Sequence, residues 1–365
     1  MWFEIENPDE ILSPALLFYP DRIKDNLNQM IQVAGTSDRL RPHVKSHKSP
    51  ELIGLQMKSG ITKFKCATLE EARMVASCHA EDVLLAMPLS GPAQKGFLQL
   101  MEQYPHVRFS VLVDHPSQLA QWQALLKPLS HQLSVFIDID AGMERTGIKP
   151  EKALRLLDQV LDEKIFHFAG LHVYDGHIHD TDYKQRVATC EQAFAPIDNL
   201  IKSIEATHGQ IPEVVCGGSI SFPIHANHPE RTLSPGTTLL WDKGYGTHFP
   251  DLGFDIAAVM LTRVISKPGA NKLCLDLGYK AIASEMQQPR VVFPQLGEVK
   301  IAGQSEEHLV IETPEAEQWN IGDVLYGLPW HICPTVALHE RATLIENKNV
   351  VGYWEISARK RQYHV

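Results

Sequence analysis

The chain has 365 residues and a formal net charge of −10, which together exclude several classes of protein. A chain of this length exceeds what one hydrophobic core usually serves, so we expect one large domain and a smaller one. The negative charge and the lack of a basic stripe argue against a nucleic-acid partner. The acidic start, MWFEIENPDEIL, is not a signal peptide. No segment provides the roughly 18 apolar residues of a membrane helix, so we expect no membrane partner.

The six cysteines are scattered along the chain and form no CxxC motif. This distribution is typical of a reducing compartment rather than of a disulfide framework. We therefore expect a cytoplasmic protein.

The chain opens with a segment, residues 1–18, that contains a short extended piece ending near Tyr19. We expect this segment to pack with a C-terminal β-domain. The next stretch, residues 21–35, has apolar side chains at helical spacing and a glycine, Gly35, at its end. This pattern predicts an amphipathic helix.

Apolar runs of strand length then alternate with helical stretches. We expect strands at 40–45, 61–67, 82–88, 107–114, 133–140, 168–174, 213–218 and 237–242. We expect helices at 70–78, 92–104, 116–126, 150–163 and 182–209. Strand alternating with helix about eight times is the pattern of a (β/α)8 TIM barrel, here over residues 19–249. An open doubly wound sheet is the alternative, but eight units without a clear break favour the barrel.

The pattern changes near Pro250. Short alternating runs follow, divided by turns such as PGAN and GD, with no clear helix between them. We expect strands within 257–265, 272–278, 297–303, 307–313, 323–329, 335–346 and 350–356. Residues 250–365 therefore predict a C-terminal all-β domain.

In a barrel of parallel strands, catalytic side chains gather at the carboxyl ends of the strands. The first expected strand delivers Lys45, the seventh ends in Gly217, Gly218 and Ser219, and the remaining polar candidates follow the fifth, sixth and eighth strands. These are Asp138, Asp140, Arg145, His172, Tyr174, Asp175, His177, His179, Asp242 and Tyr245.

The first expected strand has an unusual polar face. Arg41, His43 and Lys45 would share one side of it, and polar groups on a buried face must be paired or used. A helix begun by Pro50 and closed by Gly60 follows, so Lys45 lies where a strand leads into a loop.

The glycine pair Gly217-Gly218 follows the seventh expected strand, where barrels often bind phosphate through backbone N–H groups. Ser219 can add a hydroxyl. A lysine at strand one and a phosphate site at strand seven suggest pyridoxal phosphate held as a Schiff base. Arg145 could bond the ring oxygen or the phosphate of this cofactor. Alternatively, Arg145 forms a structural ion pair with Asp138 or Asp140.

Three histidines lie within eight residues: His172, His177 and His179. Histidine is the natural acid–base group near neutral pH, and a metal cluster is the competing interpretation. We expect at least one of the three to be structural, and which one is catalytic stays open.

Four motifs together resemble the D-threonine aldolase and D-serine dehydratase family: RPHVKSHKSPE, HVYDGH, GGS and the late HICPTV. The resemblance runs from SPALLFYPDRIKDN to HERATLIE. It implies an alanine-racemase-like pyridoxal phosphate enzyme with a TIM barrel and a β-domain. By this resemblance Lys45 is the cofactor lysine, with Lys48 as its rival, and Tyr174 and Tyr245 belong to the cofactor site. The resemblance also implies a homodimer.

The resemblance further implies a divalent metal held by a histidine and a second ligand two residues later. Here this pair is His331 and Cys333. We expect it on an extended segment, where residues two apart share a face. Imidazole with thiolate suits zinc. The family's aldolases have aspartate at the second position and its dehydratases have cysteine, so Cys333 favours the dehydratase.

We therefore expect a metal-dependent lyase of D-β-hydroxy amino acids that converts D-serine to pyruvate and ammonia. A D-threonine aldolase, with His177 as the base, is the alternative. An amino-acid racemase would need a second base and no metal, and a non-catalytic carrier of the cofactor would be a single barrel. The His331–Cys333 pair and the β-domain argue against both, and the many polar strand ends argue against a purely structural protein.

Overall fold

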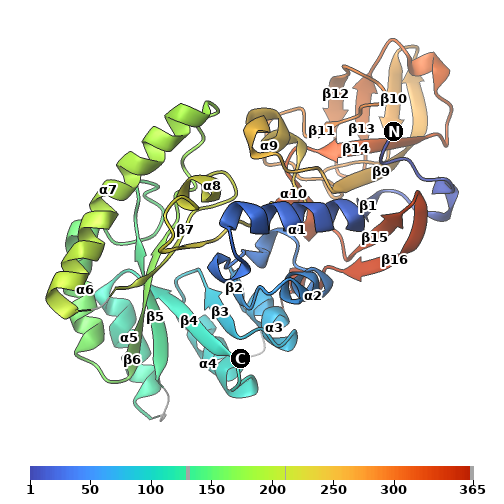
Figure 1. The fold of residues 1–365 in the computed structure, drawn as a ribbon. Coiled ribbons are helices and arrows are strands. Elements are labelled where there is room, and N and C mark those ends of the chain that lie inside the picture. The colour runs from blue at the N-terminus through green and yellow to red at the C-terminus, as the bar shows by residue number, and fades with distance from the viewer. Residues whose placement is uncertain (129–131, 210, 362–365) are drawn as a thin grey trace. The chain divides into compact units, whose positions relative to one another are not determined.

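The computed structural model describes residues 1–128, 132–209 and 211–361. These residues form two compact units, which we describe separately (Figure 1). The barrel unit contains Met30–Lys45 and Leu52–Gly236, and the β unit contains Met1–Gln29, Ser46–Glu51 and Thr237–Arg359. The division falls inside α1 (Pro20–Ala34), the amphipathic helix that the spacing predicts.

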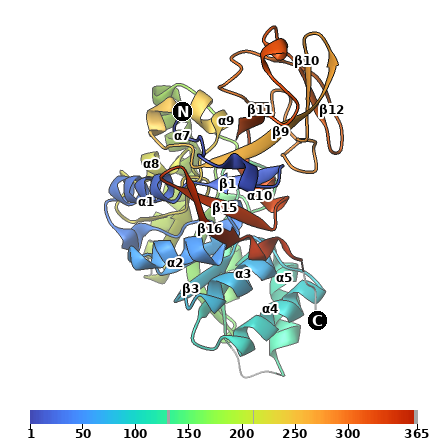
Figure 2. The same ribbon diagram turned by 90° about the vertical axis from the view of Figure 1, so that its right-hand side faces the viewer.

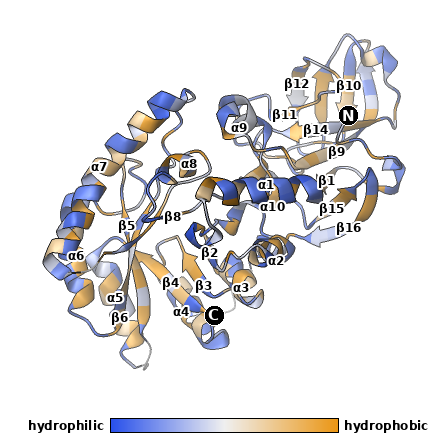
Figure 3. Ribbon diagram, viewed as in Figure 1, coloured by the Kyte–Doolittle hydropathy of each residue, from blue (hydrophilic) through white to orange (hydrophobic). Residues whose placement is uncertain are grey.

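The barrel unit is built on a sheet of seven parallel strands in the order β2 to β8. The strands are β2 (Lys63–Cys66), β3 (Asp82–Leu85), β4 (Arg108–Val113), β5 (Leu133–Ile139), β6 (Phe166–Val173), β7 (Glu213–Cys216) and β8 (Arg231–Leu233). The helices are α2 (Pro50–Lys58), α3 (Leu69–Ser77), α4 (Pro92–Gln103), α5 (Pro116–Leu126), α6 (Pro150–Leu161), α7 (Tyr183–His208) and α8 (Phe222–His225). Helices α3 to α7 cover one side of the curved sheet (Figure 1). Strands β3 and β4 are largely hydrophobic, whereas α6 and α7 carry both kinds of residue (Figure 3), because only one face of each helix packs on the sheet.

The first expected strand differs from the prediction. Residues 40–45 form no regular strand but make two isolated parallel bridges, Leu40 to Leu233 of β8 and His43 to Lys65 of β2. Pro42 lacks the N–H that a continuous ladder needs, and Val44–Ser46 turns into a 3-10 helix that carries Lys45. The segment still connects β8 to β2, so the predicted class, a barrel of alternating strands and helices with a C-terminal β-domain, is confirmed.

The expected eighth strand at residues 237–242 is wrong. The eighth position is taken by β8, and the apolar run after it forms turns and the start of α9 (Lys243–His248). Pro235 and Gly236 separate β8 from this apolar run. Leu240 and Trp241 are each 1% exposed, so this run is apolar because it is buried, not because it is a strand.

The β unit contains the second sheet, in the order β12-β13-β10-β9-β1-β15-β16 with β14 and β11 off this path. Its strands are β1 (Ala15–Phe18), β9 (Ala258–Gly269), β10 (Lys272–Leu275), β11 (Val291–Val292), β12 (Lys300–Gln304), β13 (Leu309–Glu312), β14 (Val324–Pro329), β15 (Arg341–Glu346) and β16 (Asn349–Glu355). The N-terminal β1 lies between β9 and β15 (Figure 2), antiparallel to the first and parallel to the second.

A short helix in the β unit was not expected. Residues Ile332–Ala337 form α10, so the strand expected at 335–346 begins only at Arg341. Pro334 stands in the first turn of this helix, where a missing N–H costs nothing, and the Thr335 hydroxyl donates to the His331 carbonyl at 2.8 Å. A six-residue helix carries too little periodicity to be recognised.

One buried ion pair joins the strand starts of the barrel unit. Arg41 is 0% exposed, and its guanidinium binds Asp82 at the start of β3 and lies 3.4 Å from Glu213 at the start of β7. Burial lowers the pKa of Arg41, but these two carboxylates outweigh it, and the net shift is upward. Arg41 thus ties residues 40–45 to strands β3 and β7.

Replacing Asp82 with alanine should therefore destabilise the protein strongly. We expect Asp82→Ala to lower the free energy of unfolding by about 3–5 kcal/mol, because it leaves a buried cation partly unpaired. Urea unfolding followed by circular dichroism measures this. Asp162→Ala, at an exposed helix end, should change the same quantity by less than about 0.5 kcal/mol. Equal small effects in both variants would contradict the assigned role.

Candidate active site

Three other predicted residues of the barrel unit lie around the ring of Tyr174. Tyr174 directly follows β6. The Lys45 Nζ lies 5.7 Å and the Arg145 Cζ 5.2 Å from its ring centroid. A Cβ placed on Gly218 would lie 3.2 Å from its Cε2 atom. Residues 40–45 and the loops after β5, β6 and β7 thus bring these four residues together. Among the described residues, no carboxylate forms an ion pair with Lys45 or Arg145.

The glycine loop after β7 is shaped by close packing. Gly217 has a φ of 77°, and a Cβ there would lie 2.8 Å from His225 Cδ2. Its N–H donates to the Val173 carbonyl at 3.2 Å, and the Gly218 N–H donates to Ser221 Oγ at 3.1 Å. Ser219 Oγ accepts from the N–H of Gly236 at 3.1 Å. Both glycine N–H groups are therefore bonded within the protein, and the pair serves the shape of the loop.

A buried polar network supports this loop. Asp175 accepts a hydrogen bond from Ser221 Oγ at 2.7 Å, and its other oxygen lies 2.7 Å from His225 Nε2. The second ring nitrogen of His225 lies 3.0 Å from the Arg231 guanidinium. Burial raises the pKa of Asp175, but His225 and Ser221 outweigh it, so the net shift is downward. Asp175, Cys190 and His225 have the spacing of a metal site. Both nitrogens of His225 are engaged, however, and a guanidinium lies beside it, which favours a structural role.

The three histidines after or within β6 have different surroundings. His172 is buried, with Nδ1 2.7 Å from Asp138 Oδ1. His179 is exposed. His177 is half-buried, and its Nδ1 is buried without a hydrogen-bond partner among the described residues. His172 is thus fixed by the fold, while His177 keeps a ring nitrogen unused.

The predicted metal pair lies in the β unit, and one expectation about it is wrong. The segment is not extended: His331 precedes α10 and Cys333 lies in its first turn. The two groups are nevertheless close enough for each to shift the pKa of the other. Cys333 Sγ donates to Ser46 Oγ at 3.0 Å and lies 3.4 Å from Thr237 Oγ1. His331 itself has extended dihedral angles, because the helix begins only at the next residue.

These contacts shift both pKa values in the direction of an ion pair. Burial raises the pKa of the Cys333 thiol, but the His331 imidazole and the neighbouring hydroxyls outweigh it, and the net shift is downward. Burial lowers the pKa of His331, but the Cys333 sulfur and Glu285 raise it to about 9. The Glu285 carboxylate is bonded to Nδ1 of His331, which leaves Nε2 for another ligand. A nitrogen and a sulfur with a carboxylate behind the imidazole are a donor set that fits a transition metal.

Tyr245, the remaining predicted cofactor residue, also lies in the β unit. It belongs to α9 rather than to a strand end, with Asp242 as the N-cap that accepts its N–H at 2.8 Å. Its ring centroid lies 5.1 Å from that of Trp241. Burial raises the pKa of Asp242 to about 6.

Comparison with known proteins decides the family. Residues 19–243 match the model of the alanine racemase N-terminal domain, and residues 257–345 match a putative serine dehydratase domain. This chain belongs to the alanine racemase N-terminal domain family. The predicted resemblance is thereby confirmed.

The relatives are lyases. A D-threonine aldolase from an Arthrobacter species is 29% identical over 95% of this chain and 92% of its own. The crystal structure of D-threonine aldolase from Filomicrobium marinum matches with a TM-score of 0.89 at 25% identity, covering 98% of each chain. A D-threo-3-hydroxyaspartate dehydratase from Delftia is 22% identical over 94% of this chain and 96% of its own. These homologues are pyridoxal-phosphate-dependent lyases of D-β-hydroxy amino acids, as expected from the motifs.

The residues of the barrel unit fit pyridoxal phosphate. A small pocket there is lined by polar and apolar side chains together, among them Asp138, Arg145, His172 and Tyr174. Lys45 offers an amine near the same ring, and Gly176 and Gly218 lie so close to this ring that a Cβ on either would press against it. An amine, a guanidinium and a glycine loop are what an aldehyde and a phosphate require.

Sequence reasoning missed three residues that the structure places against predicted ones. Glu285 binds His331, Ser46 accepts from Cys333, and Lys65 lies 3.4 Å from His172. Glu285 and Ser46 had no usable signal, because their partners lie 46 and 287 residues away along the chain. Lys65 did have one: it stands between Phe64 and Cys66 in a strand of a parallel sheet, whose strands are buried on both faces.

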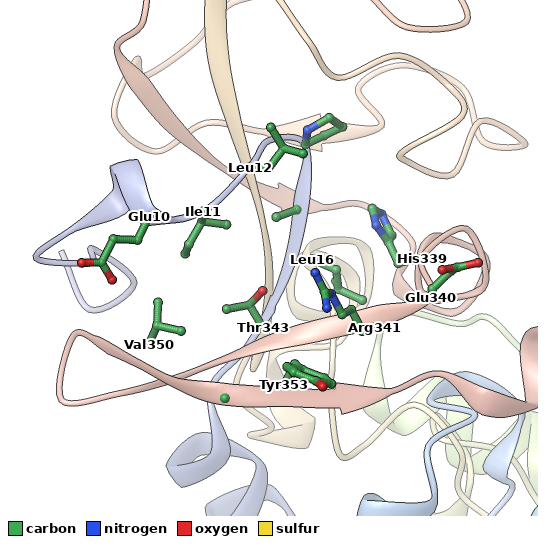
Figure 4. A pocket seen from close by; sticks show the side chains of 13 residues that line it. Glu10, Ile11, Leu12, Leu16, His339, Glu340, Arg341, Thr343, Val350 and Tyr353 are labelled. Atoms are coloured by element: carbon green, nitrogen blue, oxygen red, sulfur yellow. The ribbon is translucent and has the colours of Figure 1, made fainter.

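A pocket in the β unit is larger than the one beside Tyr174 but is not this site. It has a volume of about 490 Å³ and is lined by the N-terminal segment and the β15–β16 hairpin (Figure 4). Arg341 stacks on Tyr353 there at 5.0 Å. None of the predicted site residues lines it, so size alone does not locate the chemistry. No described helix has the length and apolarity needed to cross a membrane.

Proposed function

We propose that this chain is a metal-dependent pyridoxal phosphate lyase acting on D-β-hydroxy amino acids, and that it dehydrates D-serine to pyruvate and ammonia. The observation that carries the proposal is the His331–Cys333 pair with Glu285 behind it. It is linked along the chain to the lysine: Lys45 is followed directly by Ser46, whose hydroxyl accepts from Cys333.

We assign the cofactor site to Lys45, Arg145, Tyr174, Tyr245 and the loop Gly217-Gly218-Ser219. Lys45 would hold the cofactor aldehyde, Arg145 would bind its ring oxygen, and the glycine loop would give room to its phosphate. When bound, pyridoxal phosphate supplies an electron sink for charge that develops at the substrate Cα. The side chain of Lys45 would take up the proton that leaves this carbon.

We assign the metal site to His331 and Cys333. Two protein ligands leave positions open for water and for a substrate hydroxyl, and a Lewis acid there would ease the departure of that hydroxyl. Nitrogen and sulfur ligands favour zinc. Solved variants of the Delftia dehydratase include one with a histidine replaced, and a metal-free one with the cysteine two positions later replaced. This spacing matches the pair found here.

Retro-aldol cleavage of D-threonine to glycine and acetaldehyde is the second candidate. It is favoured by the Arthrobacter and Filomicrobium aldolases, which share more identity with this chain than the Delftia dehydratase does. In this reaction His177 would take the proton of the β-hydroxyl, since its Nδ1 is unpartnered among the described residues. We further propose a homodimer in the cytoplasm. None of the six cysteines forms a disulfide in the structure, which suits a reducing compartment.

Product analysis tests the function. Purified protein with pyridoxal phosphate is incubated with D-serine, D-threonine and their L-forms, with and without a chelator. We expect pyruvate from D-serine alone, lost on chelation and restored by zinc. Glycine and acetaldehyde from D-threonine would instead establish the aldolase. Conversion of D-alanine to L-alanine with neither product would establish a racemase and remove the role of His331 and Cys333.

A further inference from the structure

Lys65 is a buried lysine of the barrel unit that the proposed reaction does not use. It stands in β2 with 2% of its surface exposed, and its backbone N–H donates to the Pro42 carbonyl at 2.9 Å. Among the described residues, the one hydrogen-bond partner of its Nζ is Nε2 of His172, at 3.4 Å, and no carboxylate pairs with it. A buried amine without a counter-ion costs stability. Its presence therefore indicates a role other than stabilising the fold.

The Lys65 amine faces the proposed cofactor pocket. Its Nζ lies 5.6 Å from the centroid of the Tyr174 ring, and the Nζ of Lys45 lies 5.7 Å from the same centroid. Two amines and the Arg145 guanidinium thus surround one aromatic ring. The charges of the two lysines repel each other, so that protonation of one disfavours protonation of the other.

His172 connects Lys65 to a carboxylate on β5. Its Nδ1 lies 2.7 Å from Asp138 Oδ1, and the second oxygen of Asp138 accepts from Thr146 Oγ1 at 2.9 Å. An ionised carboxylate can only accept, so the proton of the neutral imidazole is on Nδ1, and Nε2 accepts from Lys65. Burial lowers the pKa of His172, and the charge of Lys65 lowers it further. The imidazole is thus held neutral in one tautomer.

We propose that Lys65 is a positioning residue of the cofactor pocket: it contacts Nε2 of His172 and keeps that imidazole neutral, and by its charge opposite Lys45 it sets the pH range in which Lys45 can take up pyridoxal phosphate. The charged or titratable groups that face it from the surrounding elements are Lys45, Asp138, Arg145, His172, Asp175 and Cys216. Strand β3, which pairs with β2, carries the carboxylate of Asp82, but Asp82 pairs with Arg41.

The chemistry follows from the charges of the two amines. Only a neutral Lys45 amine can attack the carbonyl carbon of the aldehyde, forming a C–N bond and releasing water. Burial lowers the pKa of Lys65 to about 7, and the charge of Lys45 contributes to this. While Lys65 is charged, its positive charge favours the neutral form of the nearby amine. The inference rests on the proposed role of Lys45.

Three full-length variants test the inference. Lys65→Met removes both the charge and the donor, and Lys65→Gln keeps a donor for His172 without the charge. Lys63→Met is the matched control, because Lys63 lies on the same strand but its side chain is 37% exposed. Its Nζ also has a carboxylate partner, Glu213 Oε1 at 3.9 Å. The rate of pyridoxal phosphate uptake by cofactor-free protein is followed by visible absorption from pH 6.5 to 9.5, and the His172 protonation by NMR of nitrogen-labelled histidine.

We expect Lys65→Met and Lys65→Gln to take up the cofactor roughly three- to tenfold more slowly than the wild type at pH 7, with the difference vanishing near pH 9. The His172 pKa should rise in both variants, whereas its Nδ1 should stay protonated in both, because Asp138 accepts from it. Lys63→Met should match the wild type in both measurements. Parallel uptake profiles in wild type and Lys65→Met would overturn the inference.

Stability gives a second readout that does not involve the cofactor. The folded-state pKa of Lys65, about 7, lies below the ordinary value for lysine. At a pH between these two values, Lys65 is protonated in the unfolded chain and neutral in the folded one. The cost of burying Lys65 is therefore largest below pH 7 and fades as the pH rises toward about 10. The urea midpoint of Lys65→Met should exceed that of the wild type most at pH 6 and least at pH 10. A gap that does not change with pH would contradict this.

The roles of Lys45 and Lys65 can be tested separately. If cofactor uptake does not depend on Lys45, shown by an unchanged spectrum in Lys45→Ala, the proposed function loses its lysine. If uptake depends on Lys45 but has the same pH profile with and without Lys65, only the inference about Lys65 is overturned.

Discussion

Replacing Lys45 with alanine should abolish lyase activity, with a loss in kcat/KM on the order of 10³-fold or more, because the same amine holds the cofactor and moves a proton. Lys45 is brought to the ring of Tyr174 by the 3-10 turn Val44–Ser46. No described lysine other than Lys65 lies as close to that ring in the barrel unit, and Lys65 is fully buried. The measurement is the rate of product formation with saturating pyridoxal phosphate.

The matched control is Lys48, the rival lysine in the same motif. Lys48 has a φ of 52°, a conformation that asparagine tolerates better than most residues. Lys48→Asn therefore removes the amine with little backbone strain, and we expect nearly full activity. Borohydride reduction followed by peptide mass spectrometry should place the cofactor on the peptide of Lys45. Label on Lys48, or full activity in Lys45→Ala, would refute the assignment.

Replacing Cys333 with alanine should remove the metal and most of the activity. Outer-shell partners of metal ligands are worth about 10–100-fold in affinity or activity, so loss of a ligand should cost at least about 100-fold. The thiol is well placed for this role: it contacts Ser46 and Thr237, and these hydroxyls and the His331 imidazole outweigh burial in lowering its pKa. Metal content by elemental analysis and the rate with added zinc measure the effect.

Cys333→Asp separates the identity of the metal from its presence. An oxygen ligand in place of sulfur should weaken zinc and favour manganese or magnesium. Cys274→Ala is the thiol control, since Cys274 is a free, buried cysteine of β10 in the same unit. It should keep the metal content of the wild type. Unchanged zinc content in Cys333→Ala would show that the pair is not the metal site.

The sequence by itself determined the elements whose signals are local. The helix expected at 116–126 is α5, residue for residue. The helix expected at 182–209 is α7, with Asp182 as its N-cap and Gly209 in the left-handed conformation as its C-cap. Strands β2 to β7 lie within or beside the apolar runs that predict them. Periodicity and caps depend on neighbours within one or two turns, so they are legible without a fold.

Tertiary structure decided the places where pairing partners are distant. Residues 40–45 form bridges instead of a strand because Pro42 lacks a donor and the partners lie on β8 and β2. The run at 237–242 is apolar because it is buried in turns. The imidazole of His331 meets the thiol of Cys333 although a helix begins between them.

The same division holds for the site. Residue type and spacing predict Lys45 and the glycine loop, and the resemblance to the family predicts the His331–Cys333 pair. They do not identify Lys65, Ser46 or Glu285, because each is defined by one contact with a residue far along the chain. Chemistry that depends on residue type can be predicted from sequence, whereas the protonation state of that chemistry is set by burial and neighbouring charges, which only the folded chain brings together.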